Sequence, residues 1–389
     1  MKAVKIEFKT GHYKLNSQAN FNFQLNRLIM WNGGELKDIE EISSFIKDSS
    51  SWKRSLISLG DKAISEGRTK EAIGYYRMSE FFMYDGDPDK EKYYTLASDL
   101  FYEYYKEYFE DGTVVRYSVP FEDIVLPIMY TKAKGCRKDT ILLHGGNDSY
   151  FEEFFFPMLY FSENGYDVYL FEGPGQGGVM RKQGKHFTYQ WEQPVKAILD
   201  FFALDDVTII GASLGGMLAP RAAALEKRIH RIIAWSVFTN FMDILISIQP
   251  KRAQKAVKIL FKLRMKSMIN FFFNLKMKKG DELIKWGMMH GMYAYESKTP
   301  YEYMAKMNRY QIMDVAPLID QDILIIGANQ DHFIDYRIVG EEIDALKNVR
   351  SLTVRIFTDK ENAGAHCNVG NAGLVLNTMI NWIEAIKNQ

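Results

Sequence analysis

The chain has 389 residues, of which 47% are hydrophobic and 25% charged, a composition typical of a globular protein with material for a large core. Its 49 basic residues balance 49 acidic residues, so nothing in the overall charge indicates a protein that binds nucleic acid or an anionic membrane stably. The two cysteines are far apart and the seven histidines are scattered, which argues against a disulfide framework and a metal site. The sequence shows no signal-like segment and no apolar run long enough to span a bilayer, so we expect a soluble cytoplasmic protein.

The first part of the chain predicts helices. Between residues 16 and 110, apolar residues recur at three- and four-residue spacing, as in "FNFQLNRLIMW" and "TKEAIGYYRMSEFFMY". Turn and capping signals such as "NGG", "DSSS" and "DGDPD" separate the helical stretches. We therefore predict an N-terminal helical domain over residues 1–112.

The pattern then changes to short strands. "TVVRYSVPF" and "IVLPIMYTK" alternate as a hairpin does, and nearly continuous apolar runs follow: "TILLHGG", "YDVYLFEGPG", "VTIIGAS", "HRIIAWSVF", "ILIIGANQD" and "SLTVRIFT". Helical stretches lie between these runs. This alternation predicts an α/β core with a doubly wound, mostly parallel sheet, formed by residues 113–238 and 316–389.

The segment between the two parts of the core, residues 239–315, is helical in pattern and too long for an ordinary crossover, so we expect a helical cap insertion. Nine of the 19 methionines lie between Met265 and Met313 of this segment, together with many aromatic residues. Packing of cap helices against the core is the favoured role for them, and binding of an apolar or aromatic ligand is the alternative. For the basic stretch "KRAQKAVKILFKLRMK" a solvated cap face is favoured over contact with a membrane surface.

Ser213 is the candidate nucleophile. It lies in "GASLG", a Gly-x-Ser-x-Gly motif between a predicted strand and a predicted helix. A turn this tight strains the serine backbone, needs glycine at positions 211 and 215, and points the start of a helix at the atom that the serine attacks. The alternative is a turn serine without a chemical role.

A nucleophilic serine needs a base and an orienting acid. His366 follows the last predicted strand in the small-residue loop "DKENAGAHCNVGNAG", so we expect it to be the base. Asp331, just after "DILIIGANQ", is the preferred acid, and Asp335 is the reserve; the one not used would cap a helix. The resulting order is nucleophile, acid, base.

The stretch "ILLHGGNDSYFEEF" supplies the candidate oxyanion hole. Glycines allow backbone N–H groups to approach a developing negative charge, so we assign the N–H groups of Gly146 and Leu214 as donors. We expect His144 to brace this loop, and Ser149 with Glu152 to form a capping box on the helix that follows.

Taken together, "HGG", "FEGPGQGG", "GASLGG", "GANQDHF" and "GAHCNVG" occur in the order and spacing of the α/β-hydrolase superfamily, and the chain resembles it over nearly its whole length. With its helical N-terminus it is similar to the subgroup of FrsA-type esterase-like proteins and 2,6-dihydroxypseudooxynicotine hydrolase. The resemblance implies an α/β-hydrolase fold with a catalytic triad of Ser213, Asp331 and His366, and it is compatible with a homodimer.

The expected function is therefore that of a cofactor-free serine hydrolase of the carboxylesterase type, acting on a small apolar or aromatic substrate. Cleavage of a carbon–carbon bond beside a ketone is the alternative, on resemblance alone. A catalytically silent ligand-binding protein on the same fold is the third interpretation.

Overall fold

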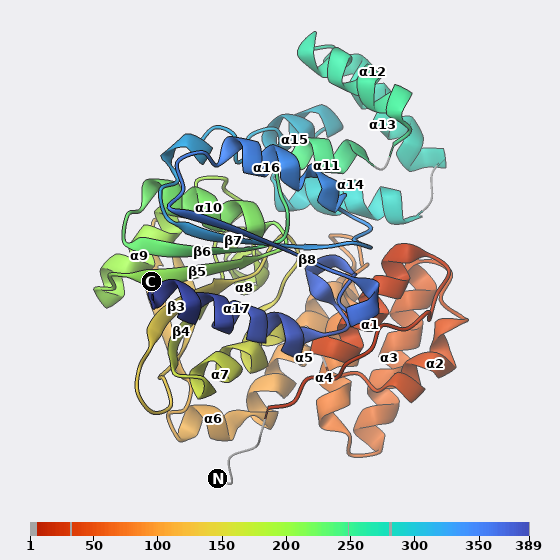
Figure 1. Cartoon of the computed structure of the whole chain (residues 1–389). Coiled ribbons are helices and arrows are strands. Elements are labelled where there is room, and N and C mark those ends of the chain that lie inside the picture. The colour runs from red at the N-terminus through yellow and green to blue at the C-terminus, as the bar shows by residue number, and fades with distance from the viewer. Residues whose placement is uncertain (1–5, 32, 248, 280–281, 389) are drawn as a thin grey trace.

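The computed structural model describes residues 6–31, 33–247, 249–279 and 282–388. At its centre lies one mixed sheet with the strand order β1-β2-β4-β3-β5-β6-β7-β8 (Figure 1). β1 and β2 form the predicted antiparallel hairpin, β2 also runs antiparallel to β4, and the remaining pairs are parallel. The strands span Val115–Phe121, Ile124–Thr131, Asp139–His144, Tyr166–Phe171, Val207–Ala212, Ile229–Trp235, Asp322–Ala328 and Ser351–Phe357, from β1 to β8.

The central strands are apolar at successive positions because helices cover both faces of the sheet. Along β5, Ile209 packs in the same cluster as Leu218 of α10, while the next residue, Ile210, packs with Met158 of α7 and Met379 of α17. Every residue of β3, β4, β5 and β7 is buried. The helices of the core are α7 (Phe155–Glu163), α8 (Gly177–Gln183), α9 (Glu192–Phe202), α10 (Gly215–Leu225), α16 (Val339–Ala345) and α17 (Ala372–Lys387).

Six helices precede the sheet and pack around aromatic residues of their own. Trp52 lies against Phe21 and Phe82, and its indole N–H donates to the carbonyl oxygen of Met78 at 2.7 Å. These helices are α1 (Ala19–Trp31), α2 (Leu36–Ser43), α3 (Ser49–Ser65), α4 (Thr69–Ser79), α5 (Pro88–Tyr104) and α6 (Lys106–Glu110), as predicted for this region.

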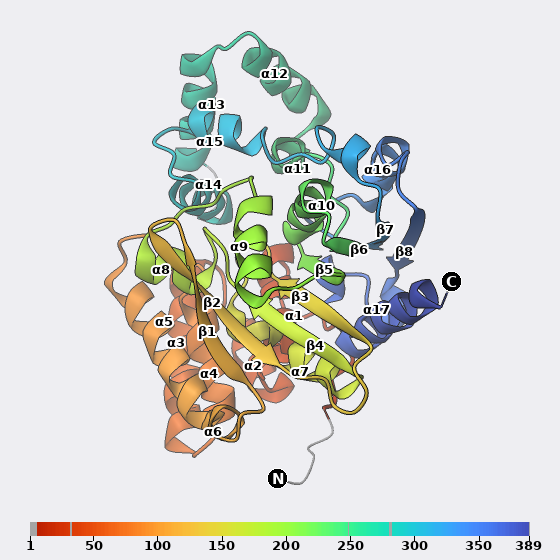
Figure 2. The ribbon, with the colours of Figure 1, turned by 90° about the vertical axis from the view of Figure 1, so that its left-hand side faces the viewer.

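The segment between β6 and β7 is helical, as its pattern predicts, and stands over one end of the sheet (Figures 1 and 2). Trp286 of this segment packs on Phe81 and Phe82, so the cap also contacts the N-terminal helices. The cap helices are α11 (Phe241–Ser247), α12 (Lys251–Lys262), α13 (Lys266–Lys279), α14 (Glu282–Ala294) and α15 (Pro300–Met307).

Short 3-10 turns complete the chain at Phe151–Phe154, Ala316–Leu318, Tyr336–Ile338, Asp359–Glu361 and His366–Asn368. Among the residues described, no helix is long and apolar enough to cross a membrane.

Candidate active site

Ser213 occupies a sharp turn between the end of β5 and the start of α10. Its φ is +59°, a left-handed conformation that is strained for a residue other than glycine. The turn is so tight that a Cβ added to Gly211 would lie 2.2 Å from the carbonyl oxygen of Gly215. The glycine therefore allows the turn that projects the serine from the sheet edge.

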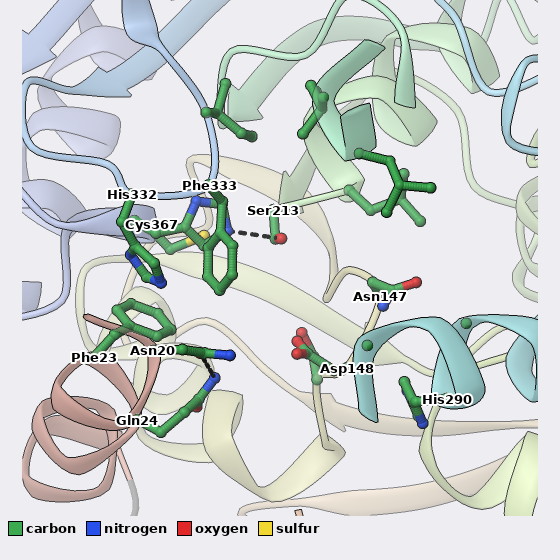
Figure 3. Close-up of a pocket in the computed structure, with 18 of the residues that line it drawn as sticks. Asn20, Phe23, Gln24, Asn147, Asp148, Ser213, His290, His332, Phe333 and Cys367 are labelled. Atoms are coloured by element: carbon green, nitrogen blue, oxygen red, sulfur yellow. Dashed lines mark hydrogen bonds between the residues drawn. The ribbon is translucent and has the colours of Figure 1, made fainter. Parts of the chain in front are cut away.

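The structure brings His366 and Asp331 to this serine. The Nε2 atom of His366 lies 2.8 Å from Oγ of Ser213 (Figure 3), and its Nδ1 lies 2.6 Å from Oδ2 of Asp331. Each residue follows a different parallel strand, β5, β7 or β8, so the three meet at the carboxyl edge of the sheet.

Both oxygens of Asp331 are engaged, because Oδ1 accepts from the backbone N–H groups of Phe333 at 2.8 Å and Ile334 at 3.0 Å. Burial alone would raise the pKa of Asp331, but the charge of His366 and these hydrogen bonds hold that pKa below its ordinary value. Burial would lower the pKa of His366, and the Asp331 carboxylate outweighs it and holds that pKa well above 6.5.

Asp335, the reserve acid, lies elsewhere. It accepts from the backbone N–H of Arg337 at 3.1 Å, as the N-cap of the turn Tyr336–Ile338, and pairs with the Arg337 guanidinium at 2.6 Å. The structure thus gives this aspartate the capping role foreseen for the acid that the site does not use.

The glycine loop after β3 packs directly on the serine turn. A Cβ added to Gly146 would lie 2.7 Å from both the Leu214 nitrogen and the Ser213 Cβ. The Gly146 N–H donates to Oγ of Ser149 at 2.9 Å. His144 is buried, its Nδ1 lies 2.9 Å from the Gly145 carbonyl oxygen, and burial lowers its pKa to about 4, so it is neutral at pH 7.

The predicted capping box of Ser149 and Glu152 is wrong. Oε1 of Glu152 instead accepts from the Arg77 guanidinium at 2.7 Å and from Oγ of Ser98 at 3.0 Å. Arg77 is only 2% exposed, and a buried cation requires a carboxylate partner. Arg77 belongs to α4, so a tertiary contact replaced the local one.

Sequence reasoning missed Gln176, which braces the glycine loop. Its Nε2 donates to the carbonyl oxygens of Gly145 at 2.8 Å and Gly146 at 3.1 Å, while its Oε1 accepts from the N–H of Gly173. A single polar residue among the glycines of "FEGPGQGG" was the available signal.

A cavity of about 530 Å³ opens above Ser213. Its walls come from three parts of the chain, the N-terminal helix α1, the core and the cap. Each part contributes aromatic side chains, among them Phe23, Trp31, Trp235, Phe241, Phe273 and Trp286. Asn147, Asp148 and His290 lie together on one side of Ser213, and Phe23 lies with His332 on the other (Figure 3).

The contribution of α1 to this cavity was also missed. Two polar residues of α1 that line the cavity, Gln24 and Arg27, are at most 6% exposed, although a surface helix keeps such side chains in water. Within the ranges that the structure describes, no group of three His, Cys, Asp or Glu residues is arranged to hold a metal ion.

Comparison with known proteins identifies the family to which the chain belongs. A sequence model described as the alpha/beta hydrolase fold matches residues 141–362. Hydrolase acrC of Aspergillus aculeatus is 25% identical, with 87% of this chain and 88% of that protein aligned. 20-Hydroxy-prefusarin hydrolase FUS2 of Gibberella moniliformis is also 25% identical, with 96% and 98% aligned.

Two solved structures share the fold over about nine-tenths of this chain. The structure of 2,6-dihydroxy-pseudo-oxynicotine hydrolase aligns with a TM-score of 0.65 at 16% identity, covering 92% of this chain and 94% of the other. That of AbyA5 aligns with a TM-score of 0.66 at 13% identity, covering 90% of each chain. These likenesses confirm the architecture expected from the sequence motifs. The chain belongs to the alpha/beta hydrolase fold family.

Proposed function

We propose that the protein is a serine hydrolase of the carboxylesterase type, with Ser213 as nucleophile, His366 as base and Asp331 as orienting acid. The observation that supports it most directly is the continuous contact from Ser213 Oγ through His366 to Asp331, at 2.8 and 2.6 Å, beneath an aromatic cavity. A serine in a strained turn, a histidine base and a buried acid form the arrangement that enzymes use for nucleophilic acyl transfer.

In the proposed reaction Ser213 Oγ attacks the substrate carbonyl carbon as its proton passes to Nε2 of His366. Asp331 stabilises the imidazolium that forms. The imidazolium then returns the proton to the leaving alcohol as the bond between the carbonyl carbon and the alkoxy oxygen breaks. Water then attacks the acyl-enzyme, His366 again accepts and returns a proton, and the acid and free Ser213 result.

The proposed oxyanion donors remain the N–H groups of Leu214 and Gly146. Leu214 immediately precedes α10, where N–H groups have no acceptor within the helix. The Gly146 N–H is held by the hydroxyl of Ser149. A charged tetrahedral oxygen is a stronger acceptor than a neutral hydroxyl, so we expect it to take that hydrogen bond from Ser149.

The cavity supports a small, largely apolar or aromatic acyl group. Its volume of about 530 Å³ is in the range of pockets that enclose a compact organic ligand. Asn147, Asp148 and His290 would meet one polar substituent of such a ligand, since these three polar residues of the cavity lie together on one side of Ser213.

Cleavage of a carbon–carbon bond beside a ketone is the second candidate. The same nucleophile and oxyanion donors serve that reaction, and the fold extends over 92% of this chain in common with 2,6-dihydroxy-pseudo-oxynicotine hydrolase. Release of a carbon leaving group needs a proton donor. Measuring hydrolysis of a panel of esters and ketones distinguishes the two reactions.

The deciding experiment is the intact mass after exposure to a small fluorophosphonate, for the wild type and Ser213→Ala in parallel. We expect one adduct on the wild type and none on the variant, with both proteins folded by circular dichroism. An adduct that persists on Ser213→Ala would contradict the assignment of the nucleophile. A folded wild type that takes no adduct would support the silent ligand-binding alternative.

A further inference from the structure

The cap helices α12 and α13 project from the molecule as a pair, at the end of the cap that lies away from the sheet (Figures 1 and 2). We refer to residues 251–279, which include both helices, as the cap hairpin. Neither the triad nor the glycine loops lie in it, so the proposed hydrolysis does not account for its outer surface.

The outer surface of the cap hairpin is unusually apolar. Six of the sixteen large hydrophobic side chains that the described residues expose lie between residues 259 and 275. Phe271 is 71% exposed and forms an outward-facing apolar stripe along α13 with Met268 and Leu275. Leu263, which is 64% exposed, extends the apolar surface from Ile259 at the end of α12. The six are Ile259, Leu263, Met265, Met268, Phe271 and Leu275.

The cap hairpin is also strongly basic. It holds ten of the chain's 49 lysine and arginine residues and none of its 49 aspartate and glutamate residues. Lys255, Lys262 and Lys266 are exposed beside the apolar surface, and Lys258 pairs with Asp243 at the base of the cap. Lysine stems were expected to cover the apolar surface here, and the exposure of Phe271 and Leu263 shows that they leave much of it open.

One helix connects this surface with the cavity. Phe273 and Lys276 of α13 line the cavity above Ser213, and Ile269 is fully buried. Phe271 and Leu275, on the same helix, face outward. The outer stripe is therefore separated from the cavity wall by the thickness of a single helix.

We propose that the cap hairpin docks reversibly on an anionic membrane surface. Exposed Phe, Leu and Met beside lysines are the composition of helices that lie in the lipid interface, where apolar side chains enter the acyl boundary and cations meet the headgroups. Docking would place the cavity wall at the interface, where apolar substrates concentrate. This differs from the solvated cap face favoured on sequence alone.

A second copy of the chain fits this surface poorly. Self-association through a two-fold axis would place the same basic helices against each other, with ten like charges on each side and no acidic residue in the hairpin to pair with them. An anionic lipid surface instead complements the basic residues and the apolar stripe together.

Vesicle co-sedimentation of the full chain tests the proposal. We expect binding to vesicles of equal parts phosphatidylcholine and phosphatidylglycerol, weakening as ionic strength rises, and at least tenfold weaker binding to phosphatidylcholine alone. The readout involves no turnover and can be repeated with Ser213→Ala, so its failure is distinguishable from failure of the proposed hydrolysis.

Matched variants locate the surface. We expect Lys255→Glu with Lys262→Glu and Lys266→Glu to weaken binding to the anionic vesicles at least tenfold. The exposed lysines Lys37, Lys70 and Lys132, changed to Glu together, should leave the affinity unchanged within twofold.

For the apolar part, Phe271→Ser should weaken binding severalfold. Phe45→Ser, at a side chain that is 69% exposed in the turn between α2 and α3, should not weaken binding. Absence of binding to the anionic vesicles at low salt would overturn the proposal, as would equal losses in the control variants. Conversion of an oligomer to a monomer by Phe271→Ser, seen by size exclusion, would overturn it in favour of an interface between copies.

Discussion

At the scale of single residues, the pair of Asp331 and His366 should determine how activity depends on pH. The carboxylate holds the pKa of His366 well above 6.5, and a protonated imidazole cannot accept the Ser213 proton. Activity should therefore be lost as the pH falls through this raised pKa, at a higher pH than an unperturbed histidine would give. A profile of kcat/KM against pH measures this loss as the acid limb of the curve.

Replacing the acid should move the limb. Asp331→Asn removes the charge that raises the pKa of His366, so we expect the acid limb to shift to lower pH and kcat to fall about 1,000- to 10,000-fold. Asp335→Asn, which changes only a turn cap, should keep kcat within a few-fold. The assignment of the acid would be reversed if the second variant lost activity and the first kept it.

Gly146 tests the oxyanion hole separately from the triad. A Cβ at this position would lie 2.6 Å from the Ala212 carbonyl oxygen and 2.7 Å from the Leu214 nitrogen, in the space assigned to the substrate oxygen. We expect Gly146→Ala to lower kcat about 100- to 1,000-fold while Ser213 still reacts slowly with a fluorophosphonate. Unchanged steady-state kinetics would exclude the glycine loop from the hole.

At the scale of elements, α16 contains a buried acid that should make stability depend on pH. Glu342 is 1% exposed, Oε1 accepts from the Phe238 N–H at 3.0 Å, and burial raises its pKa to about 8. In the unfolded chain the carboxyl titrates near its ordinary value of 4.5, so the folded state binds the extra proton between those values. The stabilisation that the protonated Glu342 carboxyl gives to the folded state is therefore present at low pH and is lost as the pH rises through about 8.

Glu342→Gln keeps the acceptor for Phe238 and removes the titration. We expect the melting temperature of the variant, relative to that of the wild type, to rise between pH 6 and about pH 8, as the wild type loses the contribution of the protonated carboxyl, and to change little above that pH. Thermal unfolding at several pH values measures this. A difference independent of pH would show that Glu342 does not titrate in this range.

The elements themselves were largely predictable. Strands buried on both faces leave uninterrupted apolar runs, and the turn around Ser213 follows from two glycines and the strand before it. Ser149 was misassigned because the competing partner of Glu152, Arg77, lies 75 residues away. Local spacing could not reveal that a buried guanidinium would take this carboxylate.

At the scale of the whole molecule, α1 is joined to the active-site loop by a buried ion pair. Arg27 donates to Glu153 at 2.8 and 2.6 Å and to the carbonyl oxygen of Asp148, which lines the cavity. Arg27→Met would leave a buried carboxylate without its cation, so we expect a loss of about 3–5 kcal/mol in the free energy of unfolding, measured in urea. Lys9→Met, in the exposed pair with Glu35, should cost less than about 1 kcal/mol.

The composition of the cavity could not be read from sequence because it depends on how distant segments pack. Ser213, Asp331 and His366 each follow a strand, so one sheet edge predicts their proximity. Phe23 and Trp286 are 263 positions apart by their numbering, and only the packing of α1 and the cap against the core brings both to one cavity. Periodicity identifies such residues as buried, without indicating which of them face a ligand.

The buried charges of the N-terminal helices also impose an order on biosynthesis. Glu80 is fully buried and pairs with Arg181, 101 residues later in the chain. The nearby Arg77 pairs with Glu152, 75 residues later. At about 5–20 residues per second, a ribosome needs about 5–20 s to add the chain between Glu80 and its partner. The ion pair of Glu80 with Arg181 can therefore form only after the fourth strand has been synthesised, and until then Lys90 of α5 is the basic residue that the N-terminal helices themselves supply to Glu80.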